Sequence, residues 1–243
     1  MSSSLSNQTQ TSVWSNYIVP YASPPIAAGA GIVPVFYGFV AKSAMQLGQP
    51  LPKMTVKEVL QEGGKAAPTI GIIVGTQMIV QSVAENAFMK NTKNEQPSFK
   101  LMIASSLLVG GFSAPALAVF NAQTMGRSVA DSLKSLTTKQ VVAIVTRETS
   151  FLFSLRISDP ASDAMKSYCG DNKAIEYSSA FATGFIGSII GHPADTALTL
   201  WQKGRKIEKL SQLKQGVLIK AFAVGGFSVI YKVTKEWLQS QSF

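Results

Sequence analysis

Long stretches with few charged side chains constrain this chain more than any other feature of its sequence. Six such segments occupy about residues 20–47, 66–89, 100–125, 138–158, 174–201 and 215–238. Each is long enough for a helix to cross the hydrocarbon core of a bilayer, which takes about 20 residues. Stretches such as APTIGIIVGTQMIV are apolar or small on every side, whereas a helix of a soluble protein shows a polar stripe. The sequence therefore predicts an all-α membrane protein with six transmembrane helices.

The charge content supports a membrane protein and indicates the class of partner. Charged residues make up 14% of the chain, against roughly 25% in a soluble globular protein. The net charge of +9 is suited to nucleic acid, an anionic lipid surface or an anionic solute. No basic cluster interleaved with aromatic residues is present, as a nucleic-acid surface requires. We therefore expect membrane lipid and a small solute as partners, and no nucleic acid.

Catalysis, metal binding and cofactor binding have little support. Cys169 and His192 are the only cysteine and histidine, so a disulfide within the chain and a cysteine- or histidine-rich metal site are excluded. No phosphate-binding loop, HExxH motif or dinucleotide fingerprint in the required context is present. We expect no enzyme activity and no cofactor. Residues 1–18 are polar and uncharged except for the terminus, and we expect a flexible tail there.

Three prolines divide the chain into similar thirds. Pro34, Pro115 and Pro193 each lie within an odd-numbered segment and follow a glycine-containing stretch. A proline inside a helix removes one backbone hydrogen bond and kinks the helix. The loops after the odd segments contain the short amphipathic stretches TVKEVLQEGG, SVADSLKSLTTK and GRKIEKLSQLKQG. We therefore expect three pseudo-repeats of two helices, at residues 19–98, 99–173 and 174–243, with short connecting helices.

This organisation resembles the mitochondrial carrier family. Its members have three tandem repeats of two membrane helices, and each odd helix contains the pattern Pro-x-Asp/Glu-x-x-Lys/Arg with a glutamine nine positions after the proline. The third repeat carries the most complete match, because Pro193, Asp195 and Gln202 occupy the proline, acidic and glutamine positions. The resemblance covers about residues 20–240. It implies a carrier-like six-helix bundle in the mitochondrial inner membrane, with the outer mitochondrial membrane as an alternative.

Other family motifs match less fully. Glu62-Gly63 resembles an acidic-glycine motif of the family, and Arg147-Glu148 is similar to a pair that contacts substrate in carriers of amino and keto acids. The sequence Tyr231-Lys232-x-x-Lys235 resembles an aromatic-acidic-x-x-basic motif of the even helices, with lysine in the acidic place.

The gate positions depart from the family pattern. In carriers, three acidic and three basic positions form a ring of ion pairs that closes the matrix side. Here the acidic positions hold Phe36, Leu117 and Asp195, and the basic positions hold Phe39, Phe120 and Leu198. A ring of three salt bridges cannot form from these residues. We expect the five apolar side chains to plug that end instead, and Asp195 to face Thr196, Thr199, His192 or water.

The remaining charged and amide side chains inside the segments are candidate solute contacts. Arg147 and Glu148 bind a solute or pair with other helices, for instance with Glu85; being adjacent on a helix, they are not expected to face each other. Lys220 contacts an anionic solute or snorkels to the interface. Gln77 and Gln81 line a cavity or hydrogen-bond between helices.

Loop charges and the resemblance together give a functional prediction. The loops after the odd segments, counted with Lys139 at the start of the fourth segment, hold eleven basic and four acidic residues. The loops after segments two and four, counted with Lys100 at the start of the third segment, hold five and four. The positive-inside rule therefore places the odd loops on the inner side, where by the resemblance they could bind cardiolipin. We predict a carrier-like transporter of a small anionic or zwitterionic solute. The alternatives are a transport-inactive protein of the same fold that serves as a structural or adaptor subunit of a membrane assembly, and a pore or proton-leak protein.

Overall fold

The computed structural model describes residues 19–89, 97–123, 130, 134 and 136–241, without the side chains of residues 119–123. The described residues form helices and no strands. The elements, in chain order, are α2 Val19–Gln46, α3 Val56–Met89, α4 Phe99–Gln123, α6 Thr138–Arg156, α7 Ser158–Cys169, α8 Lys173–Gln202, the 3₁₀ helix η2 Leu210–Lys214, and α9 Val217–Ser240. The predicted all-α class is confirmed for this part of the chain, whereas the predicted tail at 1–18 lies outside the described residues.

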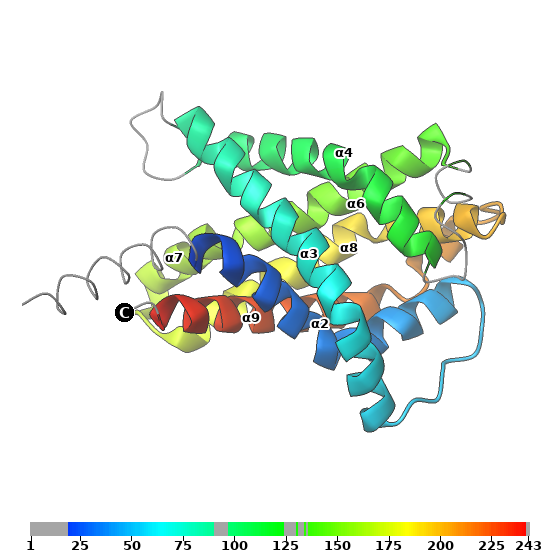
Figure 1. The fold of residues 1–243 in the computed structure, drawn as a ribbon, viewed down its shortest axis with the longest axis horizontal. Coiled ribbons are helices and arrows are strands. Elements are labelled where there is room, and N and C mark those ends of the chain that lie inside the picture. The colour runs from blue at the N-terminus through cyan, green and yellow to red at the C-terminus, as the bar shows by residue number, and fades with distance from the viewer. Residues whose placement is uncertain (1–18, 90–96, 124–129, 131–133, 135, 242–243) are drawn as a thin grey trace, which may run out of the picture.

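Six long helices surround a common interior (Figure 1). Neighbours in chain order pack on each other from α2 through α3, α4, α6 and α8 to α9, and α9 packs on α2. One end of the bundle, here called the outer end, contains the ends of α3 and α9 and the start of α4 (Figure 1). The loop after α2 and the segment containing η2 lie at the opposite end, here called the inner end.

Four regions of the described chain are long and apolar enough to cross a membrane: Val19–Gln46, Val56–Met89, Phe99–Ala118 and Leu210–Ser240. These four make the chain a candidate multi-pass membrane protein. Helices α6 and α8 fall outside this set, and both bury polar side chains on their inner faces, among them Glu148, Asp195 and Gln202. Length and composition therefore identify four candidate membrane spans among the described residues, and the predicted six are not confirmed.

The three repeat prolines occupy equivalent surroundings. Pro34, Pro115 and Pro193 are exposed on the outside of α2, α4 and α8, and each helix continues through its proline. Bends in α2 and α4 are visible in Figure 1. The side chain two positions later is Phe36, Leu117 or Asp195, and it is partly or fully buried in each case. A proline kink thus leaves its free backbone carbonyl near the surface and turns the third position of the motif inward.

Two loop predictions are wrong. The stretch TVKEVLQEGG belongs to the long helix α3, because Thr55 begins that helix with a capping box in which Glu58 accepts a hydrogen bond from Thr55 N at 2.7 Å. The stretch after the fourth segment, predicted as a loop, forms α7, which is followed by Gly170 with φ 86°. Most of SVADSLKSLTTK lies outside the described residues. The third amphipathic stretch contains η2.

The apolar interior consists of two clusters. One combines Ile32, Met78, Leu152 and Phe227, with Phe36 and Phe39 packed against it. The other combines Leu117, Ile144 and Leu198. Of the five apolar gate side chains, Phe36 and Phe39 pack on the first cluster, and Leu117 and Leu198 belong to the second. The side chain of Phe120 lies outside the described residues, and the apolar plug stays a prediction.

Candidate functional site: a buried charge cluster at the inner end

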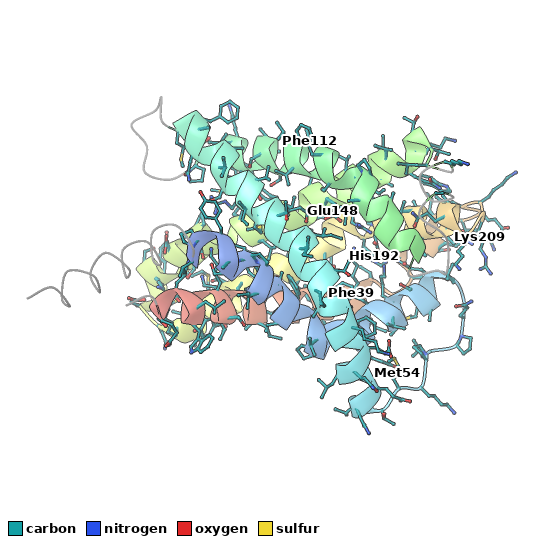
Figure 2. All side chains as sticks on the ribbon, viewed as in Figure 1. Phe39, Met54, Phe112, Glu148, His192 and Lys209 are labelled. Atoms are coloured by element: carbon teal, nitrogen blue, oxygen red, sulfur yellow. The ribbon has the colours of Figure 1, made fainter. Side chains whose placement is uncertain are left out.

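Five charged side chains from four helices meet inside the inner half of the bundle. They are Lys42 of α2, Arg147 and Glu148 of α6, Asp195 of α8 and Lys220 of α9, and each is at most 12% exposed. We call this set the inner charge cluster. Figure 2 shows Glu148 and His192 within the bundle, whereas Phe112 lies on its surface. Burying a charge this deep in a membrane protein costs free energy unless the charge is paired. Such charges are therefore rare, and they usually mark a functional site.

Asp195 is the centre of the cluster. Its carboxylate lies 2.8 Å from Lys42 Nζ, 3.3 Å from Arg147 Nη1 and 3.5 Å from Lys220 Nζ. Gln46 of α2 also donates to Asp195 Oδ2 at 3.0 Å. The threonine hydroxyls and His192, expected as partners of the Asp195 carboxylate, are therefore wrong, because Lys42, Gln46 and Arg147 take that place. The carboxylate is held by three cations from three other helices, which compensates its burial.

Arg147 and Glu148 contact each other despite their adjacent positions. Arg147 Nε donates to Glu148 Oε1 at 2.7 Å, so the expectation that they do not face each other is wrong. Their side chains are long enough to converge even though their Cα–Cβ bonds diverge. Arg147 also pairs with Asp195 of α8 rather than with Glu85. It thereby links the two carboxylates of the cluster.

The cluster carries one uncompensated positive charge. Its cations are Lys42, Arg147 and Lys220, and its anions are Glu148 and Asp195. Lys220 is 6% exposed, so the alternative that it snorkels to the interface is wrong. It lies farther from Asp195 than Lys42 does, which leaves it the cation held least tightly. A small anion bound beside Lys220 would neutralise the cluster.

Gln46 and His192 surround the cluster without adding charge pairs. Gln46 donates to Thr196 Oγ1 at 2.9 Å and accepts from Thr199 Oγ1 at 3.0 Å. His192 Nε2 lies 2.8 Å from the carbonyl oxygen of Gln215. Gln46 also lines a pocket of about 580 Å³ at the inner end, together with Arg205 and other polar residues. Gln46 therefore contacts both this pocket and Asp195.

The predicted gate residues lie at opposite ends. Gln202 donates to the carbonyl of Ala118 at 3.3 Å and so braces α8 against α4 near the inner end. Tyr231 is buried near the outer end and stacks on Phe227. Lys235 is partly buried one turn farther along α9, and the structure gives it no ion pair among the described residues. Gln202 and Asp195 therefore lie in the inner half of the bundle and Tyr231 and Lys235 near the outer end, so these four gate candidates do not form one site.

Gln77 and Gln81 connect helices. Gln77 Nε2 donates to Ser113 Oγ at 2.8 Å and to Glu148 Oε2 at 3.3 Å. Gln81 Nε2 donates to Ser106 Oγ at 2.9 Å. The alternative of interhelical hydrogen bonding is confirmed for both side chains. Gln77 also connects α3 to the inner charge cluster.

A second buried ion pair, which the sequence did not predict, lies near the outer end. Glu85 of α3 is fully buried and accepts from Arg156 Nε of α6 at 2.6 Å. Arg156 was not singled out because it closes the fourth segment, where an arginine is ordinary. The spacing of Gln77, Gln81 and Glu85 at intervals of four was the available signal, since it puts all three on one helix face.

Outside the long helices, α7 is fastened by ion pairs at the outer rim. Lys166 pairs with Asp171 at 2.8 Å and with Glu176 at the start of α8. These hydrogen bonds to carboxylates raise the pKa of the Lys166 amine above its usual value. Lys232 of α9 pairs with Asp159 of α7 at 2.7 Å. The rim therefore ties α7, α8 and α9 together, and we assign it no solute contact.

No protein-family model matches the chain, and no curated protein matches it significantly.

Proposed function

We propose that this chain is a six-span membrane protein that transports a small anionic or zwitterionic solute in the manner of a mitochondrial carrier. The observation that supports it most is the excess positive charge of the inner charge cluster, contributed by four helices around one interior. A transporter must hold its solute among side chains of several helices that can move relative to one another. Lys220 and Arg147 are the proposed solute-binding residues.

Exposed side chains support six spans. Apolar side chains project outward from all six long helices, and those of α6 and α8 include Val142, Ile186 and Ile190. Exposed aromatic residues gather at the outer end of the bundle: Tyr21, Phe88, Phe99, Tyr168 and Trp237. Tyrosine and tryptophan prefer the boundary between lipid and water. A bilayer around the whole bundle would bury the apolar faces of α6 and α8 along with the other four.

The mitochondrial inner membrane is proposed on the resemblance in the third repeat alone. Basic residues of the inner loops, such as Arg205 and Lys206, would face the matrix. Two such residues beside helix ends favour binding of an anionic lipid such as cardiolipin.

A structural or adaptor role is the second candidate, and one observation favours it. Asp195 is already engaged by Lys42, Arg147, Lys220 and Gln46. A network this well connected would lock α2, α6, α8 and α9 together and so oppose the helix movements that transport requires.

Uptake by proteoliposomes separates the two candidates. The purified protein would be reconstituted and supplied with a labelled monocarboxylate, dicarboxylate, amino acid or neutral polyol. The transport proposal expects saturable uptake of at least one charged solute, with the Lys220→Gln protein showing at least about 10-fold lower affinity. Lys57→Gln, at an exposed position on α3, is the matched control and should resemble wild type. Folded protein without saturable uptake of any charged solute would sink the transport proposal and favour the structural role.

A further inference from the structure

A row of buried polar side chains runs along the interface of α3 with α4 and α6, beside apolar side chains such as Met78 and Val109. On α3 the row consists of Gln77, Gln81 and Glu85, each at most 3% exposed. Spacing by four residues aligns them over about 12 Å of helix. The α4 side supplies Ser105, Ser106 and Ser113, and the α6 side supplies Glu148 and Arg156. We call these eight residues the polar seam.

The neighbouring interfaces show what ordinary packing looks like in this bundle. Where α2 meets α3, a Cβ added to Gly75 would lie 2.5 Å from Pro25 Cα, so the two backbones are in direct contact. Where α6 meets α8, a Cβ added to Gly187 would lie 2.9 Å from the carbonyl oxygen of Ser150. Close contact through small residues is the usual way in which membrane helices associate. The polar seam therefore needs a separate explanation.

Hydrogen bonds run along the seam from one carboxylate almost to the other. At the outer end, Ser105 Oγ donates to Glu85 Oε1 at 2.7 Å, and Gln81 Nε2 donates to Ser105 Oγ at 3.1 Å. At the inner end, Gln77 Nε2 donates to Ser113 Oγ and to Glu148 Oε2. Only the one helical turn between Gln77 and Gln81 separates the two sets.

Two acceptors in this stretch have no donor among the described residues. Gln77 Oε1 and Gln81 Oε1 are both buried and lack a hydrogen-bond partner. Thr149 Oγ1 of α6, one residue after Glu148, is in the same condition. A buried carbonyl oxygen without a donor costs about 1–3 kcal/mol, and water commonly satisfies such groups when several polar atoms surround it.

We propose that the polar seam is a hydrated track that passes protons between the outer end of the bundle and the inner charge cluster. Its two ends are the only carboxylates of the seam, Glu85 and Glu148. Each lies beside an arginine, Arg156 or Arg147. The seam would operate whether or not the cluster also binds a solute.

The proton transfer requires only water as a co-reactant. A hydronium ion at the outer end would give its proton to Glu85, forming a neutral carboxyl. That carboxyl would return the proton to a water hydrogen-bonded to Gln81 Oε1 or Gln77 Oε1. Each water then forms one O–H bond and breaks another, and the last would protonate Glu148. Release from Glu148 to water at the inner end would restore the starting state, so one proton crosses and nothing is oxidised or reduced.

Proton flux into proteoliposomes tests the proposal. Vesicles loaded with a pH-sensitive dye would be given an inside-negative potential by potassium and valinomycin. We expect wild-type protein to acidify the lumen faster than protein-free vesicles. Replacing Gln81 by leucine preserves side-chain volume but removes the acceptor, and it should lower the protein-dependent rate at least about 10-fold. Glu85→Gln should do the same, whereas Gln81→Asn should retain a measurable part of the rate.

Gln61→Leu is the matched control, because Gln61 is exposed on the same helix and should conduct like wild type. A wild-type rate equal to that of empty vesicles would overturn the proposal. A folded Gln81→Leu or Glu85→Gln protein that conducts protons like wild type would also overturn it, and one such variant is enough. A cooperative thermal unfolding transition in detergent would verify that the variant is folded. Solute uptake measured on the same preparations keeps the two proposals apart. Proton flux without saturable solute uptake would support the proton path and contradict the transport proposal. Saturable uptake without proton flux would contradict only the proton path.

Discussion

Lys42 Nζ of α2 lies 2.8 Å from Asp195 Oδ2 of α8, and 153 positions of sequence separate these two buried residues. The pair ties the first predicted repeat to the third at the inner end. The resemblance to carriers predicts a basic residue at position 39, which holds Phe39, three positions before Lys42. An ion pair therefore joins the first and third predicted repeats, although the basic position of the first proline motif holds phenylalanine.

Removing either member of this pair should have unequal effects. Asp195→Asn leaves three cations with Glu148 alone, and we expect it to lower the free energy of unfolding by about 3–5 kcal/mol. Lys42→Gln leaves Asp195 with Arg147 and Lys220 and balances the charges of the cluster, so its cost should be about 1 kcal/mol. Unfolding in detergent micelles measures both. Lys57→Gln, an exposed lysine, should change stability by less than about 0.5 kcal/mol. A Lys42→Gln cost as large as that of Asp195→Asn would contradict this account of the cluster.

The outer pair should show a similar asymmetry for a different reason. Glu85 is fully buried, whereas the Arg156 side chain is 22% exposed. Arg156→Gln strands a carboxylate inside the bundle and should cost about 3–5 kcal/mol. Glu85→Gln removes the buried charge, keeps an oxygen that can accept from Ser105, and leaves Arg156 able to reach water, so about 1–2 kcal/mol is expected. The same unfolding assay ranks the two variants, and the reverse order would mean that the carboxylate is hydrated in the absence of the arginine.

Glycine packing between α2 and α3 gives a third prediction. A Cβ on Gly75 would lie 2.5 Å from Pro25 Cα, and neither backbone can yield without separating the helices. Gly75→Ala should therefore cost about 1–3 kcal/mol. Gly111→Ala is the matched control, because a Cβ there meets nothing within 4 Å. Alanine is the better helix former by roughly 0.5–1 kcal/mol, so the control should be neutral or slightly stabilising. Equal effects of the two substitutions would show that α2 and α3 are not in close contact.

The long apolar segments predicted the helices well because apolar runs and helix length are both local properties. Segment boundaries at residues 20–47 and 174–201 agree with α2 and α8 within a residue or two. The start of α3 was missed by ten residues. Its first turns are amphipathic and exposed, and only the capping pair of Thr55 and Glu58 marks where the helix begins.

The sequence predicted which residues form most of the candidate site, but it did not predict which side chains contact each other. Lone charges in apolar segments identified Arg147, Glu148, Asp195 and Lys220, because such charges stand out against their neighbours. Their pairing depends on which helices adjoin around the interior and on rotamers of long side chains, and neither property is encoded locally. Lys42 is not among the residues predicted for the site, since a lysine close to a helix end is unremarkable in sequence.

The number of membrane crossings can be decided with the native cysteine. Cys169 is exposed at the end of α7, and it is the only cysteine of the chain. With six spans, the loop after α2 and the end of α7 lie on opposite sides of the membrane. If only the four regions of sufficient length and hydropathy crossed, α6, α7 and α8 would stay on the side of that loop.

Gln49→Cys combined with Cys169→Ser places the single thiol in the loop after α2. In sealed vesicles of uniform orientation, we expect an impermeant maleimide to label one of the two proteins and not the other, while a permeant maleimide labels both. Labelling of both proteins from the same side would establish four crossings and remove the bundle's interior from the bilayer, and with it the proposed transport path.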